Sequence, residues 1–290
     1  MRLIQDDGHG DFSLVEQTDN NIPHYAILSH TWGADSEEVT FKDLMQGTGK
    51  NKHGYKKIEF CGKQAAEDGL QYFWVDTCCI DKSSSAELTE AINSMFRWYR
   101  HAARCYVYLS DVSTNGLSFL SWEVAFRNSR WFTRGWTLQE LLAPPLVEFF
   151  SLEGKRLGDK KSLEQQVYEV TGVATGALQG DTLLKFSVAE RMSWAEKRET
   201  RREEDKAYSL LGIFNVHIPL IYGEGKENAL RRLRDEITSQ LPQPSPPAPS
   251  AIIPFRRDRD FVERPVLGDI SQRAAEPGAR IGLIGLGGVG

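Results

Sequence analysis

The 290-residue chain is poor in cysteine, has no long apolar run and has no excess of basic residues. Its four cysteines form no C-x-x-C pair, which argues against a zinc ribbon or a thioredoxin-like motif, so we expect reduced thiols and no metal site. No apolar run approaches the roughly 20 residues that cross a bilayer, so we expect no membrane span. With 40 acidic and 35 basic residues the formal charge is −5, so nucleic acid, which attracts basic surfaces, is not an expected partner. Residues 1–7 lack the apolar stretch of a secretory signal, and we therefore expect a cytoplasmic protein.

What the sequence does contain is an alternation of strand and helix patterns up to about residue 150. Apolar runs predict strands at 25–28, 72–75, 105–109 and 147–150, and apolar residues at helical spacing predict helices at 55–68, 86–100, 122–130 and 133–142. Short strands separated by helices form parallel βαβ units. We therefore predict an α/β fold with a parallel sheet flanked by helices.

The second half of the chain is mainly helical up to a proline-rich break. The expected helices are 163–171, 188–198, 201–214 and 227–238. The charge run Arg201–Lys206 (RREEDK) predicts a solvated helix turn with weak surface ion pairs. Five prolines within 241–250 predict an extended linker. We expect a domain over 1–240 (a core at about 20–150 and a helical extension at about 151–240), a linker over 241–254 and a last piece over 255–290.

Polar residues gather where three of the expected strands end. Ser29–Trp32 follow the first strand, Asp76 and Asp81 follow the second, and Ser110 follows the third. Ligands of parallel sheets bind at the carboxyl ends of the strands, so these side chains are candidates for a binding site. Serine and aspartate also cap turns and helices, so the pattern alone leaves a capping role open.

Four blocks of sequence, in this order, resemble the heterokaryon incompatibility (HET) domain of fungi. They are Tyr25–Gly33 (YAILSHTWG), Trp74–Asp81 (WVDTCCID), Arg130–Pro144 (RWFTRGWTLQELLAP) and Glu203–Phe214 (EEDKAYSLLGIF), the last followed by Ile221–Gly225 (IYGEG). The resemblance covers about residues 20–240. It implies a part in fungal non-self recognition, a form of innate immunity that ends in regulated cell death.

Within the third block, Trp136–Leu141 (WTLQEL) is similar to the W-x-L-x-E-L helix of plant TIR domains. This distant resemblance implies a TIR-like, flavodoxin-like sheet and self-association through TIR-like interfaces. It also implies that Glu140 is the catalytic residue of an NAD glycohydrolase, with NAD or NADP as substrate and no further cofactor. Two interpretations stay open: an enzyme that hydrolyses NAD when oligomerised, and a non-enzymatic adaptor of the same fold that recruits partners while Glu140 is structural.

The chemistry of NAD hydrolysis needs one well-placed carboxylate, because positive charge builds on the ribose while nicotinamide leaves as a neutral ring. Trp136 lies one helical turn before Glu140 and would stack on a heteroaromatic ring of the substrate. Trp32 would stack on adenine, and Arg134 would pair with a phosphate. The expected substrate-binding residues are Ser29, His30, Thr31, Trp32, Gly33, Asp76, Asp81, Ser110, Arg134 and Trp136.

The glycine-rich end, Gly285–Gly290 (GLGGVG), matches the first part of a phosphate-binding loop, G-x-x-x-x-G, and also the dinucleotide fingerprint G-x-G-x-x-G. A phosphate-binding loop continues with a lysine and a serine or threonine after its last glycine, and those positions lie beyond the sequence. Both interpretations, the phosphate-binding loop and the dinucleotide fingerprint, therefore stay open. Its position resembles the start of the nucleotide-binding (NB-ARC- or NACHT-like) module of NLR-like receptors. We expect residues 255–290 to be a truncated start of such a module, to which ATP would belong.

Overall fold

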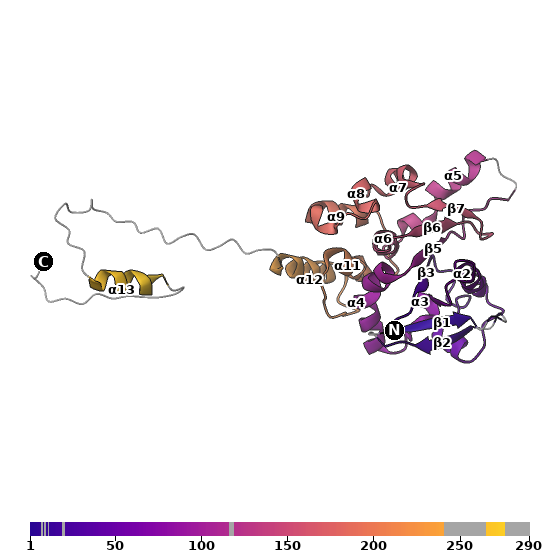
Figure 1. Cartoon of the computed structure of the whole chain (residues 1–290), viewed down its shortest axis with the longest axis horizontal. Helices are drawn as coiled ribbons and strands as arrows, with labels where there is room; N and C mark the ends of the chain where they lie inside the picture. The colour runs from indigo at the N-terminus through magenta and orange to yellow at the C-terminus, as the bar shows by residue number, and fades with distance from the viewer. Residues whose placement is uncertain are drawn as a thin grey trace, which may run out of the picture. The chain divides into compact units, whose positions relative to one another are not determined.

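A computed structural model describes residues 1–6, 8, 10, 12–18, 21–115, 119–240 and 265–275 (Figure 1). The chain divides into two units, Met1–Pro242 and Gln243–Gly290. The second unit contains the helix α13 (Pro265–Ala274). The predicted linker over 241–254 and the glycine-rich end lie outside the described residues, and they stay predictions.

Seven strands of the described residues form one mixed sheet in the first unit. They are β1 (Arg2–Asp6), β2 (Phe12–Glu16), β3 (Tyr25–His30), β4 (Tyr72–Trp74), β5 (Arg104–Tyr108), β6 (Val147–Phe150) and β7 (Arg156–Asp159), in the spatial order β2-β1-β4-β3-β5-β6-β7. The four central strands are parallel, and the strands at the two edges are antiparallel to their neighbours. Counted along the chain, the parallel strands follow the order 2-1-3-4, which begins the flavodoxin-like order. The predicted α/β fold is confirmed.

Helices cover both faces of the parallel strands, which explains why every position of β3 and β6 is buried. The core helices are α1 (Phe41–Met45), α2 (Tyr55–Glu67), α3 (Asp76–Cys79), α4 (Ser85–His101), α5 (Phe119–Arg127), η1 (Arg130–Thr133) and α6 (Thr137–Leu142). Side chains alternate along β5. Tyr106 and Tyr108 pack around Phe60 of α2, with ring centroids 6.4 and 5.0 Å from it. The Cys105 thiol instead lies 3.8 Å from the Glu140 carbonyl oxygen, so α6 lies on the face opposite α2.

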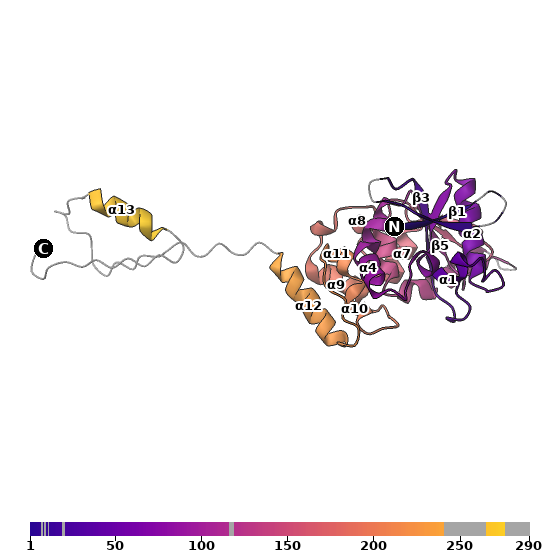
Figure 2. The same ribbon diagram turned by 90° about the horizontal axis from the view of Figure 1, so that it is seen from below.

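The predicted helical extension is also present. It contains α7 (Glu164–Thr171), α8 (Thr175–Leu178), η2 (Leu183–Lys185), α9 (Val188–Glu196), α10 (Asp205–Tyr208), α11 (Leu211–Phe214) and α12 (Lys226–Ser239). In Figure 2, α11 lies beside α4, and the two helices are in contact. A Cβ atom on Gly212 of α11 would lie 2.1 Å from the Cβ of Phe96, so this close approach requires glycine.

The continuous helix expected over 201–214 is wrong, because the segment forms the two short helices α10 and α11. Glu204 accepts hydrogen bonds from the backbone N–H groups of Gly223 and Gly225, at 2.7 and 3.1 Å, which ties the start of the segment to a loop. Asn215 ends α11 with a left-handed φ of 55°. Tertiary contacts have therefore replaced the regular helix that the spacing favours.

The hairpin of β1 and β2 is an element that the sequence pattern does not predict. Leu3 and Ile4 of β1 are fully buried, and β1 also pairs with β4. The turn holds Gly8 and Gly10 with φ values of 81° and 90°, a region that glycine adopts without strain. Within the described part of the chain, no helix combines the length and apolarity that a membrane crossing needs.

Candidate functional site

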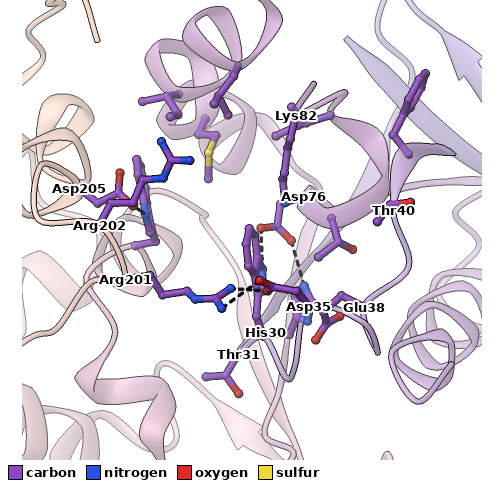
Figure 3. Close-up of a pocket in the computed structure, with 18 of the residues that line it drawn as sticks. His30, Thr31, Asp35, Glu38, Thr40, Asp76, Lys82, Arg201, Arg202 and Asp205 are labelled. Carbon is purple, nitrogen blue, oxygen red and sulfur yellow. Dashed lines mark hydrogen bonds and ion pairs between the residues drawn. The ribbon is translucent and has the colours of Figure 1, made fainter. Parts of the chain in front are cut away.

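A cavity of about 780 Å³ lies at the carboxyl ends of β3 and β4 (Figure 3). In the sheet, β4 lies on one side of β3 and β5 lies on the other, so the order of the strands reverses at β3. Ligands of open α/β sheets bind beside such a reversal. The loop after β3, the segment from α3 to Ser83, and α6 line the core side of the cavity. The extension lines the opposite side with Arg201, Arg202, Asp205 and Tyr222.

Glu140 lines this cavity from α6 and is only 6 % exposed. The hydroxyl of Ser29, the fifth residue of β3, donates a hydrogen bond to the Glu140 carboxyl group. The Trp131 indole N–H in turn donates to the Ser29 oxygen at 2.7 Å. Ser29 and Trp131 are fully buried, so a rigid chain of hydrogen bonds holds the Glu140 carboxyl in one orientation.

The surroundings of Glu140 favour its neutral form. Burial raises the Glu140 pKa to about 8, and the negative charge of Asp76 adds to the increase, whereas the Ser29 hydrogen bond and the Arg198 charge oppose it. Glu140 is therefore mostly protonated at pH 7 in this state. A cation bound in the cavity would stabilise the carboxylate and lower that pKa.

Arg198, a residue that the sequence analysis did not select, fixes the start of α6. Its Nη1 donates to the Arg134 carbonyl and to the Thr137 hydroxyl, both at 2.9 Å, and its Nε donates to the Trp194 carbonyl at 3.2 Å. Arg198 is 4 % exposed, and burial lowers its pKa to about 10 while Glu140 opposes that change. The extension thus helps to position the helix that carries Glu140.

A second carboxylate, Asp76, joins two of the predicted residues after β3. Its oxygens lie 2.9 Å from His30 Nε2 and 2.9 Å from Trp32 Nε1. Burial acts to raise the Asp76 pKa, but the Lys82 charge, His30 and the Trp32 hydrogen bond outweigh it and hold the pKa at about 2. Lys82 Nζ lies 3.6 Å from the centroid of the Trp32 ring, so this ammonium covers one face of the indole.

Asp205 is a further buried acid, on the extension side of the cavity. It accepts hydrogen bonds from Trp136 Nε1 at 3.2 Å and from the Tyr222 hydroxyl at 3.0 Å, and burial raises its pKa. The Arg202 guanidinium lies 4.2 Å from the Tyr222 ring centroid. Arg201 forms an ion pair with Asp35, and the two side chains reach toward one another from separate segments in Figure 3.

The prediction that the charge run 201–206 forms a solvated helix turn is therefore wrong. Glu204 and Asp205 are 7 and 8 % exposed, because both carboxylates accept hydrogen bonds from other parts of the fold. Lys206 donates to carbonyl groups at the end of α9 and just after it, including Ala195 at 2.9 Å. Three residues of this run line the cavity: Arg201 and Arg202, which are exposed, and Asp205, which is buried.

Most of the predicted site residues come together at the cavity. Those that line it are His30, Thr31, Trp32, Asp76, Asp81, Arg134, Trp136 and Glu140. Three others do not line it: Ser29 is buried and supports Glu140, the Gly33 N–H donates to Glu38 at 2.6 Å, and the Ser110 hydroxyl lies 3.5 Å from that of Thr31. Lys82, Arg202, Asp205 and Tyr222 were not selected, although Asp205 and Tyr222 lie within the quoted sequence blocks.

Comparisons with known proteins find similarity to one family. The family model described as heterokaryon incompatibility protein (HET) matches residues 25–124, a range that ends before Glu140. The chain is 59% identical over 241 residues to vegetative incompatibility protein HET-E-1 of Podospora anserina. That match covers 82% of this chain and 18% of the relative, so the chain spans less than a fifth of the relative's length. No solved structure matches the chain.

Proposed function

We propose a function for this chain from its membership of the heterokaryon incompatibility (HET) family. The chain acts in vegetative incompatibility, and it does so by hydrolysing NAD at Glu140. The relative's name supports the first part of the proposal. The observation that carries the second part is a buried carboxylic acid, oriented by Ser29 and Trp131, on the wall of a cavity at the carboxyl ends of parallel strands.

The cavity suits a dinucleotide in size and in the chemistry of its walls. A volume of about 780 Å³ lies within the roughly 300–1,000 Å³ of small-molecule sites. Trp32 and Trp136 offer aromatic surfaces for the two bases. Arginine and lysine side chains on the same walls offer charges for the phosphates.

In the proposed reaction the bond between ribose C1 and the nicotinamide nitrogen breaks. The electron pair stays on nitrogen, so nicotinamide leaves as a neutral molecule and positive charge develops on the ribose. Water adds to C1 and releases one proton, which leaves ADP-ribose. Ionised Glu140 would stabilise the ribose charge and accept the proton from water.

The raised pKa of Glu140 fits this sequence of events. The acid holds its proton at pH 7 in the absence of substrate, because its pKa is about 8. The positively charged nicotinamide ring of NAD would favour the carboxylate when it binds. The Glu140 carboxylate would then be present only in the complex with NAD, where the reaction needs it. Self-association of the chain would increase the activity by ordering the site.

The test measures nicotinamide released from NAD by concentrated purified protein. We expect release by wild type and a decrease of at least about 100-fold in Glu140→Gln, since one group that stabilises transition-state charge contributes about that much. Glu90→Gln, an exposed change on α4, is the matched control and should be fully active. Equal release by Glu140→Gln would refute the role of Glu140. No release by folded wild type at any concentration would favour the adaptor function.

A further inference from the structure

We propose that Arg134 of the core and Arg201 and Arg202 of the extension together form an arginine wall, which recognises the diphosphate bridge of a dinucleotide. The inference rests on the proposed function and names the part of the substrate that this wall binds. It assigns to the charge run 201–202 a ligand-binding role that its sequence pattern does not indicate.

Backbone pairing brings the two arginine-bearing segments side by side. The Gly135 N–H donates to the Glu199 carbonyl at 2.8 Å, and the Glu199 N–H donates to the Thr133 carbonyl at 2.5 Å. A Cβ atom on Gly135 would lie 2.5 Å from Thr200 Cγ2, so glycine is needed for this approach. Arg134 and Arg201 therefore lie on two backbone segments that are hydrogen-bonded to each other, and not on independent loops.

Arg134 lines the cavity, and among the described residues its guanidinium has no protein partner, since it makes no hydrogen bond or ion pair with any of them. Its backbone carbonyl, in contrast, accepts hydrogen bonds from Arg198 and from the Thr137 hydroxyl, at 2.9 and 2.8 Å. The backbone is fixed and the charged group is available, which is the arrangement that a bidentate phosphate contact requires.

Arg201 and Arg202 add two more charges beside Arg134. Arg202 stacks on Tyr222, an arrangement that orients its guanidinium and leaves the N–H groups at its edge for an anion. Arg201 pairs with Asp35, but the Arg201 side chain is half-exposed and the Asp35 side chain mostly exposed, and such ion pairs are weak. A diphosphate can therefore replace Asp35 as the partner of Arg201 at little cost.

The position of the wall matches the order of groups in the substrate. Arg134 precedes α6 by three residues, and Glu140 lies on that helix. The diphosphate bridge follows the nicotinamide ribose directly in NAD. A ribose at Glu140 therefore keeps the bridge within the same cavity, whose walls carry the three arginines. Asp35 and Asp205 also line this cavity, and each already has partners, in Arg201 and in Trp136 with Tyr222.

The test measures binding of ADP-ribose and of adenosine to the full chain by calorimetry. ADP-ribose contains the diphosphate, and adenosine lacks it. We expect Arg134→Gln and Arg202→Gln each to weaken ADP-ribose binding about tenfold or more while adenosine binding changes less than about twofold. Arg231→Gln, an exposed change on α12, is the matched control and should leave both affinities unchanged.

The outcomes separate this inference from the proposed function. If ADP-ribose binds no tighter than adenosine, or if Arg134→Gln and Arg202→Gln bind ADP-ribose as wild type does, the arginine wall is refuted even when wild type releases nicotinamide from NAD. If the arginine variants lose ADP-ribose binding but wild type releases no nicotinamide, the wall is supported and the hydrolytic function is refuted. Added salt should weaken ADP-ribose binding to wild type more than to the arginine variants.

Discussion

The buried acid at Glu140 makes the stability of this protein depend on pH in a way that one substitution should remove. Its pKa is about 8 in the folded protein, against an ordinary value of 4.5 in the unfolded chain. The folded state therefore keeps a proton that the unfolded state loses. The stability linked to this proton is fully present below pH 4.5 and is lost as the pH rises toward 8. The difference between the two pKa values corresponds to roughly 5 kcal/mol, an upper figure for one buried group.

Glu140→Gln removes this titration and keeps a similar shape with an oxygen that can accept the Ser29 hydrogen bond. The free energy of unfolding of the variant, relative to wild type, should rise by roughly 3–5 kcal/mol between pH 4.5 and pH 8. Urea denaturation of both proteins at several pH values measures this difference, and other titrating groups cancel in the comparison. Parallel pH profiles for the two proteins would refute the claim that Glu140 is a buried, protonated acid. Glu90→Gln should follow wild type throughout.

Two further substitutions test the surroundings of the cavity. The pKa of Asp76 is about 2 rather than 3.8, so this carboxylate stabilises the fold above pH 3.8 and the effect is lost as the pH falls through 2. Asp76→Asn should therefore lower the free energy of unfolding by roughly 2 kcal/mol at pH 7, as measured in urea, and a loss that persists unchanged near pH 2 would contradict this reasoning. Gly135→Ala should lower the free energy of unfolding by roughly 1–3 kcal/mol, because the added Cβ would meet Thr200, and it should also weaken ADP-ribose binding. A variant that matches wild type in both measurements would show that the close approach is not required.

The parallel strands of the sheet could be predicted from sequence because each is a short apolar run, which can be recognised from its own residues without knowledge of its partners in the fold. The runs at β3, β5 and β6 are buried on both faces, and each is followed by a helix or a turn with a clear signal. The hairpin of β1 and β2 was missed because its strands show no sustained alternation of apolar and polar residues. Its stability depends on pairing of β1 with β4, which lies about 70 positions later in the chain.

The catalytic candidate could be selected from sequence, but its environment could not. A glutamate on a short helix is usually exposed, and only the resemblance to a known helix pointed to Glu140. Its partner Ser29 lies 111 positions earlier, so no local pattern indicates that the two side chains meet. The prediction for the charge run failed for the same reason, since Glu204 accepts hydrogen bonds from Gly223 and Gly225 and Asp205 accepts one from Trp136, 69 positions earlier.

The most direct test of the account compares substrate binding and bond cleavage in one pair of proteins. NAD binding and the rate of nicotinamide release under single-turnover conditions are measured for wild type and Glu140→Gln. We expect NAD affinities within a few-fold of each other and a cleavage rate that is lower by at least about 100-fold in the variant. A cleavage rate in Glu140→Gln equal to that of wild type would contradict it.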